Sequence, residues 1–197
     1  MYSKKPLIVI GFHGCEQKTR DDLVNCKKQM IHSDKDYDWL GHGMYFWEGN
    51  IERAWQWAQE KDGIKIPSVI GAIIDLGLCL DLIDSKYLKM LKTAYILLKT
   101  SYKNAKIILP ENKKRNPGDT TLLKELDCAV IETLHSILDQ NDEKKFDSTR
   151  GVFWEGPELY ENTDFREKNH IQICVRNPNC IKGFFIPRQT DSNWKIP

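Results

Sequence analysis

Two short segments carry side chains suited to holding a ligand in a fixed orientation. Phe12-His13-Gly14 ends a short apolar run, and the glycine-punctuated stretch Gly41–Ala58 delivers Tyr45 among several other rings. A neutral imidazole can donate one hydrogen bond and accept another. A tyrosine ring offers a flat surface on which a planar ligand can stack. The two segments therefore predict either a pocket with one ring at a fixed point or a core crowded with aromatic residues.

A third segment, near the C-terminus, supplies polar side chains on one face. The sequence HIQICVR alternates, so His170 and Gln172 should face one way and the aliphatic residues between them the other. Taken singly, each candidate has a commoner structural role: a histidine at a strand end is usually structural, and an amide can satisfy a backbone group. The hypothesis of a site rests on their joint occurrence in one chain.

Two charged residues leave alternatives open. Arg150 either pairs with a surface carboxylate or clamps a pyrophosphate, because a guanidinium binds phosphate through two parallel hydrogen bonds. Glu155 lies between a tryptophan and a glycine. It is either a solvated turn residue or a carboxylate within the site.

The cysteines do not indicate a metal site. The six cysteines include no C-x-x-C pair, and a ligand set of His170, Cys174 and Cys180 fits no common zinc spacing. We expect no metal, and we expect most thiols to be reduced and buried.

Hydrophobic periodicity predicts the elements that position these residues. The apolar, β-branched run at 6–14 predicts a buried strand. Residues 50–63 predict a helix with Asn50 as its cap. Its apolar stripe comprises Ile51, Ala54, Trp55 and Ala58. Trp55 is therefore expected in the core.

The middle of the chain, about residues 80–145, predicts a helical elaboration. Two amphipathic helices are expected at about 85–105 and 122–140, with a basic, solvated loop between them at 106–119. The stripe of the first comprises Leu88, Leu91, Tyr95 and Leu98. His135, beside the stripe of the second, is expected to be structural or exposed.

The remaining segments predict strands, and the whole predicts one α+β domain. Strands are expected at 148–156, 170–176 and 180–188, with a polar loop at 157–168 anchored by buried Leu159, Tyr160 and Phe165. There is no regular βαβ rhythm, no P-loop and no G-x-G-x-x-G between a strand and a helix.

Charge and hydropathy exclude some partners. The chain has 29 Lys and Arg against 28 Asp and Glu, so no overall basic footprint indicates a nucleic-acid partner, although a local patch would suffice. The apolar run near the N-terminus is too short for a signal peptide, and no segment approaches a membrane-spanning length. We expect a cytoplasmic protein with no membrane partner.

The order and spacing of the motifs resemble a known family. His13-Gly14, Gly43-Met44-Tyr45-Phe46 and the segment 169–175 are similar to the motifs of the ADP-ribosyltransferase superfamily, in its histidine–tyrosine branch, which includes diphtheria-type toxins and poly(ADP-ribose) polymerases. The resemblance covers nearly the whole chain except about 80–145. It implies a single domain over 1–197 with a split β core of short strands, flanking helices and a helical insertion in the middle.

The resemblance implies a role for each matching residue, with NAD as the substrate. His13 would hydrogen-bond the adenine-side ribose, and the Gly14 backbone would pair with the nicotinamide carboxamide. Tyr45 would stack on the nicotinamide ring, and Gly43 would give the backbone room to approach. Phe46 would lie buried beneath.

The implied reaction breaks the bond between nicotinamide and ribose. The ribose becomes oxocarbenium-like, as in glycoside hydrolysis, and a polar or anionic group near that charge is needed. The family usually places a glutamate at the head of the C-terminal strand, where this chain has His170, with Gln172 two residues on. Glu155 is a third candidate for the missing carboxylate. Without the glutamate we expect transfer of a single ADP-ribose and no polymer.

The function expected from the resemblance is therefore NAD-dependent mono-ADP-ribosylation, in a toxin-like or defence-like enzyme. The acceptor would be a protein or nucleic acid contacted by the loop 157–168, and an antitoxin or inhibitor protein is a further implied partner. The alternatives are an NAD glycohydrolase, in which water replaces the acceptor, and an inactive module that binds NAD or ADP-ribose. An interaction domain with an aromatic core is favoured only if His13 and Tyr45 lie far apart.

Overall fold

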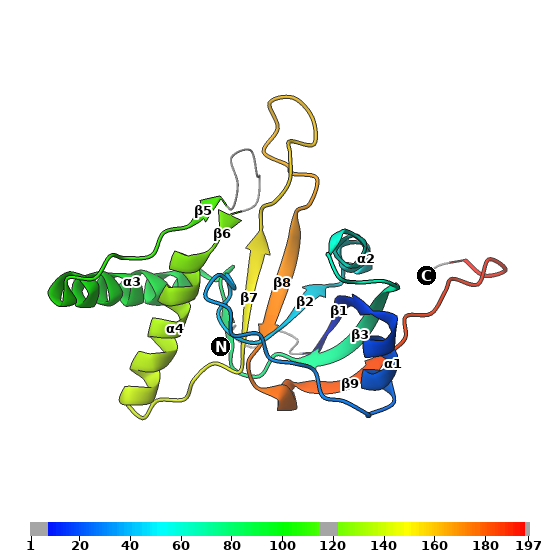
Figure 1. The fold of residues 1–197 in the computed structure, drawn as a ribbon, viewed down its shortest axis with the longest axis horizontal. Coiled ribbons are helices and arrows are strands. Elements are labelled where there is room, and N and C mark those ends of the chain that lie inside the picture. Colours follow the sequence, from blue (N-terminus) through cyan, green and yellow to red (C-terminus); the bar gives the residue numbers. More distant parts are fainter. Residues whose placement is uncertain (1–7, 115–121, 196–197) are drawn as a thin grey trace.

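A mixed seven-stranded sheet forms the centre of the protein, and the α+β class expected from the sequence is confirmed (Figure 1). The computed structural model describes residues 8–114 and 122–195. The sheet has the order β4-β7-β8-β2-β1-β3-β9. Its strands are β1 (Ile8–Glu16), β2 (Met44–Glu48), β3 (Pro67–Asp75), β4 (Cys79–Asp81), β7 (Ser148–Phe153), β8 (His170–Val175) and β9 (Ile181–Phe185).

Two pairs of helices lie around this sheet. Helices α1 (Gln17–Val24) and α2 (Ile51–Glu60) lie near β1 and β3, whereas α3 (Ser85–Ala105) and α4 (Glu125–Gln140) form the predicted helical insertion beside β7 (Figure 1). A small ribbon of β5 (Lys113–Lys114) and β6 (Leu122–Leu123) joins α3 to α4. Residues 115–119 of the expected basic loop lie outside the described residues. Among the described residues, no helix has both the length and the apolarity needed to cross a bilayer.

The sheet opens between β1 and β2. These strands pair at Gly11↔Glu48 and Phe12↔Trp47, whereas β1 continues to pair with β3 as far as its last residue, Glu16. Beyond Phe12 the link between β1 and β2 is a side chain, because His13 Nδ1 lies 2.8 Å from the backbone oxygen of Tyr45. The strands therefore form a fork beyond Phe12.

The main core lies on the face of the sheet opposite Tyr45. Phe46 is fully buried there with Ile74, Ile173 and Val175, which confirms the expected burial of Phe46 and the alternation of β8. The insertion has its own core, which includes Leu80, Ala94, Leu98, Val130, Leu134, Leu138 and Phe146.

Two expectations about apolar residues are wrong. Leu88 is half exposed, because α3 packs through Ala94 and Leu98 and Leu88 lies at the margin of that arc. The loop between β7 and β8 projects away from the body (Figure 1). Its three expected anchors, Leu159, Tyr160 and Phe165, are each more than half exposed, because none of the described elements covers the projecting loop.

Helix α2 packs tightly on β1 because β1 has a glycine beneath it. The Asn50 side chain caps the helix by accepting a hydrogen bond from Arg53 N at 3.0 Å, as predicted. Ala54 and Ala58 are fully buried, and Trp55 is half-buried against the same cluster. A Cβ atom added at Gly14 would lie 2.3 Å from the Ala54 carbonyl oxygen. Gly14 is thus required for the approach of the helix.

Gly14→Ala should lower the free energy of unfolding by about 1–3 kcal/mol, because either the helix or the strand must move to admit the methyl group. Urea denaturation measures this. Gly183→Ala in β9 is the matched control, since a Cβ there meets nothing within 4 Å, and it should leave stability unchanged or slightly raised. Equal losses in both variants would contradict the packing argument.

Candidate functional site

A pocket of about 940 Å³ lies at the fork between β1 and β2. Five of the predicted site residues line it, and they come from three separate parts of the chain: His13, Gly43, Tyr45, Glu155 and Gln172. The loop 28–39 forms another wall, and the insertion contributes Leu123 and Lys124, which lie just before α4. The residues singled out from sequence at the two ends of the chain therefore meet in one cavity.

His13 can accept a hydrogen bond from a ligand. Burial lowers the pKa of His13 below its usual value, against the opposing effect of its bond to Tyr45, so the ring is neutral at pH 7. Its Nδ1 must carry the proton, since the Tyr45 carbonyl at 2.8 Å can only accept. The lone pair is therefore on Nε2, which suits a ribose hydroxyl as the donor.

The Tyr45 ring is held rigidly. Its backbone pairs with Cys174 of β8, and its hydroxyl donates to the Gly41 carbonyl at 2.6 Å while accepting from Leu40 N at 3.1 Å. Burial raises the pKa of the phenol, so the group stays neutral. A ring fixed at both ends is suited to serve as a stacking platform, because little conformational entropy is lost when a planar ligand binds.

Gln172 offers donors to the pocket. Trp39 Nε1 donates to Gln172 Oε1 at 2.7 Å, and an indole nitrogen can only donate, which fixes the orientation of the amide. The N–H groups of the Gln172 amide are thus the ones that can meet a ligand. They suit a hydroxyl or carbonyl oxygen and supply no negative charge.

Glu155 places a carboxylate at the pocket wall, which Asp38 also lines, and Glu155 is paired with an arginine of α2. Arg53 Nη2 lies 3.0 Å from Glu155 Oε2, and the two side chains are 7% and 17% exposed. Arg53 Nη1 also donates to Gln56 at 2.7 Å. A carboxylate held by a buried guanidinium keeps a defined position at the pocket wall.

Three predicted site residues, His170, Arg150 and Gly14, do not line the pocket. The His170 ring stacks on Phe153 with centroids 5.1 Å apart, and its Nδ1 lies 2.6 Å from the Lys168 oxygen. His170 is therefore packed beside the site without lining it. Arg150 binds the Glu48 carboxylate through Nε and Nη2 and lies 3.4 Å from Asp81. Its guanidinium is occupied by carboxylates, which corrects the interpretation of a pyrophosphate clamp.

At the two predicted glycine positions, close packing requires the absence of a side chain, which the sequence did not show. Gly14 does not line the pocket and lies under α2. At Gly43, an added Cβ would lie 2.5 Å from Cys174 Sγ and 2.6 Å from the Val175 oxygen. Gly43 thus allows β2 to approach β8, and the expected room for a ligand is at most a second consequence.

Sequence reasoning missed several aromatic and charged residues of the pocket. They are Lys28, Lys35, Tyr37, Asp38, Trp39, Trp47, Arg53, Trp57, Lys124 and Phe153. For Arg53 and Trp57 a signal existed, because they lie four residues apart on α2 and therefore share a face, which is distinct from its apolar stripe. Trp47 and Trp57 pack with ring centroids 6.0 Å apart. Nothing local pointed to Trp39, which reaches the site through its bond to Gln172.

The insertion holds the loop that fixes Tyr45. Glu132 of α4 accepts hydrogen bonds from both terminal nitrogens of Arg176 and, at 2.8 Å, from His42 N. Gly41, with φ +80, has a conformation favoured by glycine, and a Cβ there would lie 2.5 Å from Glu132 Oε1. The same Gly41 supplies the carbonyl that accepts from the Tyr45 hydroxyl. Glu132 therefore acts on the ring through the backbone of residues 41–42.

Comparisons with known proteins give one distant relative and no family. An uncharacterized protein of Methanocaldococcus jannaschii is 26% identical over 194 residues, covering 87% of this chain and 83% of the relative. No family model matches the chain. No solved structure matches it.

Glu132→Gln should lower the free energy of unfolding by about 1–3 kcal/mol at pH 7. Burial acts to raise the pKa of Glu132, but the hydrogen bonds from Arg176 and His42 outweigh it, so the pKa lies below its usual value. The carboxylate therefore contributes stability above the unfolded-state pKa of about 4.3, and this is lost as the pH falls through the folded-state pKa.

The difference between wild type and Glu132→Gln, measured by urea denaturation, should thus narrow below about pH 4. Glu143→Gln, an exposed position just after α4, is the control and should match wild type throughout. A difference that stays constant from pH 7 to acid would show that the charge of Glu132 is not what stabilises the loop.

Proposed function

We propose that the protein is an NAD-dependent mono-ADP-ribosyltransferase, which cleaves the nicotinamide–ribose bond and transfers one ADP-ribose to a macromolecule. The observation that carries the proposal is the meeting of His13 and Tyr45 at the fork, with Gln172 and Glu155 lining the same pocket. The resemblance drawn from the sequence predicts that these residues share a cleft. An interaction domain with an aromatic core would not need them to do so.

In this proposal the pocket binds NAD in an extended orientation. The nicotinamide ring stacks on Tyr45, whose position is fixed by Gly41 and Leu40. A hydroxyl of the adenine-side ribose donates to Nε2 of the neutral His13. The amide of Gln172 donates to an oxygen of the nicotinamide-side ribose, which positions the bond to be broken.

Cleavage needs only charge stabilisation beside the sugar. The C–N bond breaks with its electron pair moving to the nicotinamide nitrogen, and positive charge develops on the ribose ring. We assign stabilisation of this charge to the Glu155 carboxylate, because Arg53 holds it in a defined position at the pocket wall. The acceptor then attacks the anomeric carbon and loses its proton, so one ADP-ribose is transferred.

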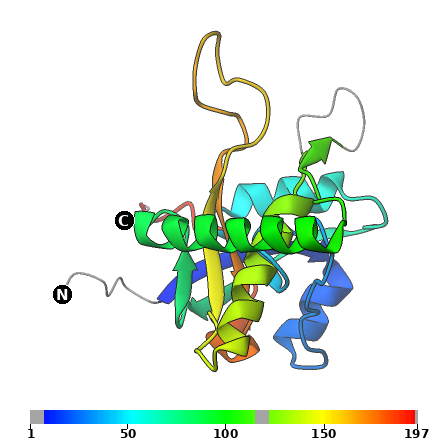
Figure 2. The same ribbon diagram turned by 90° about the vertical axis from the view of Figure 1, so that its left-hand side faces the viewer.

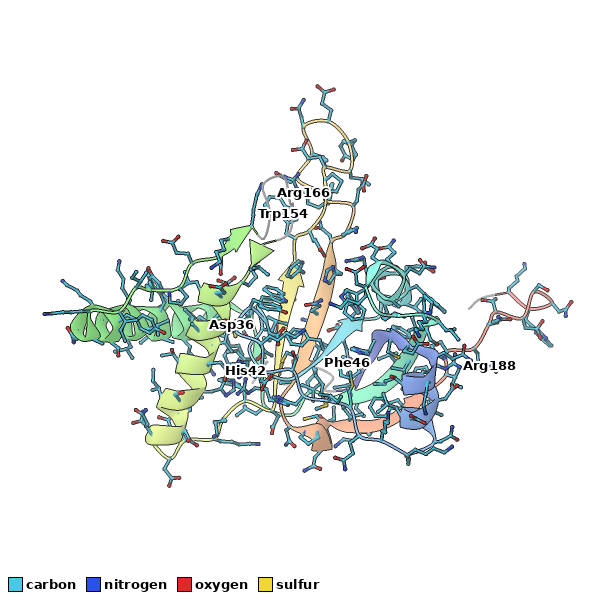
Figure 3. All side chains as sticks on the ribbon, viewed as in Figure 1. Asp36, His42, Phe46, Trp154, Arg166 and Arg188 are labelled. Atoms are coloured by element: carbon cyan, nitrogen blue, oxygen red, sulfur yellow. The ribbon has the colours of Figure 1, made fainter. Side chains whose placement is uncertain are left out.

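The projecting loop supports a protein as the acceptor. Trp154, Leu159, Tyr160 and Phe165 are each more than half exposed, and Trp154 donates to the Asp164 oxygen at 2.8 Å with Arg166 stacked over its ring (Figure 3). An ordered loop with aromatic residues is typical of a protein interface. Its acidic residues, Glu158, Glu161, Asp164 and Glu167, disfavour a nucleic acid at this loop.

Two other functions use the same pocket. An NAD glycohydrolase would release nicotinamide without labelling a macromolecule, and a binding module would bind NAD without releasing nicotinamide. Incubation with NAD labelled in the adenosine half, with nicotinamide and protein-bound label measured in parallel, separates the three.

Tyr45→Ala should reduce nicotinamide release at least about 100-fold, since the stacking platform is lost and the bound geometry with it. Tyr45→Phe keeps the ring and should retain more activity. Trp55→Ala, on the helix face that packs against the core, should mainly lower stability. If Tyr45→Ala releases nicotinamide at the wild-type rate, Tyr45 is not the platform.

Glu155→Gln should lower turnover by about 100-fold or more while leaving the affinity for NAD within a few-fold of wild type. The amide keeps a hydrogen-bond acceptor for Arg53 but removes the negative charge. His170→Gln is the comparison, and it should not show the same selective loss of turnover, because His170 does not line the pocket. Unchanged turnover in Glu155→Gln would remove this carboxylate from the mechanism.

A further inference from the structure

Helix α3 carries lysines that pair with no carboxylate among the described residues. Lys86, Lys89, Lys92, Lys99 and Lys103 lie on the helix and Lys106 is its C-cap, while 85–110 contains no Asp or Glu. All six are exposed. Two of them lie over tyrosine rings of the same helix, Lys86 over Tyr87 and Lys99 over Tyr95. The segment is thus strongly basic in a chain whose net charge is +1.

The acidic residues nearby do not neutralise α3. The adjacent helix α4 contains four acidic residues, Glu125, Asp127, Glu132 and Asp139. Three of them pair with cations outside α3: Glu125 with Lys113, Glu132 with Arg176 and Asp139 with Lys145. Within the described part of the chain, Asp127 forms no ion pair with a lysine of α3. Like charges held along one helix repel one another. A bound polyanion would relieve this repulsion.

Four of these lysines form a track on the outward side of α3. Lys89, Lys92, Lys99 and Lys103 are separated by steps of three, seven and four residues, so they lie on one face of the helix. At 1.5 Å per residue the track is about 21 Å long. The apolar side of α3 is already used, since Ala94 and Leu98 pack in the core of the insertion. Figure 2 shows α3 lying across the front of the molecule with no element covering its outer side.

We propose that this lysine track is a docking surface for the sugar-phosphate backbone of a nucleic acid. A linear series of flexible ammonium groups matches a linear series of phosphates. A membrane would instead require an outward apolar face, and the centre of this face has a single large apolar residue, Ile96, between lysines. The surface is separate from the pocket at the fork, so the inference stands whether or not the proposed enzymatic function does.

The track predicts nucleic-acid binding that is independent of base sequence and strongly dependent on salt. Binding is measured by fluorescence anisotropy with labelled mixed-sequence DNA and RNA, single-stranded and duplex, between about 50 and 200 mM salt. The test variant replaces Lys89, Lys92, Lys99 and Lys103 by glutamine. Its affinity should fall at least about tenfold. For a single strand, the negative slope of log K against log salt should become shallower by about 3.

The matched control removes the same charge elsewhere. Lys27, Lys61, Lys65 and Lys182 are also exposed, and replacing these four by glutamine should leave affinity and slope close to wild type. Circular dichroism of both variants checks that the fold is intact. The proposal is overturned if wild-type protein binds none of the oligonucleotides, if both quadruple variants lose affinity equally, or if the protein binds phosphatidylserine vesicles and no oligonucleotide. Nicotinamide release from free NAD, measured on the same variants, reports separately on the proposed function.

Discussion

The hydrogen bond between His13 Nδ1 and the Tyr45 backbone is the contact on which the site depends. Two antiparallel strands normally continue their ladder, and continued pairing of β1 with β2 would close the space that the pocket occupies. Here the ladder ends after Phe12↔Trp47, and one imidazole spans the gap at 2.8 Å. The bond thus joins the two strands where their backbone ladder has ended, and the space left between them holds the pocket. It also fixes the tautomer of His13, so that its second nitrogen can accept.

The insertion belongs to the site as well as to the fold. Its helix α4 supplies Glu132, which holds the backbone of residues 41–42, and the segment just before α4 supplies Leu123 and Lys124 to the pocket wall. Tyr45 is therefore fixed from two directions. Strand β8 pairs with its backbone, and the insertion holds the loop to which its hydroxyl is bonded. A segment that lies outside the family resemblance thus completes the pocket in this chain.

Local periodicity predicted the parts of the structure that local forces determine. The cap at Asn50, the buried Ala54 and Ala58, and the alternation of β8 all follow from patterns of three to four residues or of two. Partnerships across the chain were not predictable in this way. Arg150 meets Glu48, which is 102 positions away, and Gln172 meets Trp39, which is 133 positions away. The predicted burial of the apolar anchors in the projecting loop was wrong for a related reason, since an apolar residue is buried only where another element covers it.

The central claim is that the nicotinamide ring of NAD lies on Tyr45 within the fork. A crystal structure of the protein with a non-hydrolysable NAD analogue tests it most directly. The account predicts the nicotinamide stacked on the Tyr45 ring, a ribose hydroxyl bonded to His13 Nε2, and the Glu155 carboxylate beside the nicotinamide-side ribose. A dinucleotide bound with its nicotinamide away from Tyr45, or bound outside the fork, would contradict it.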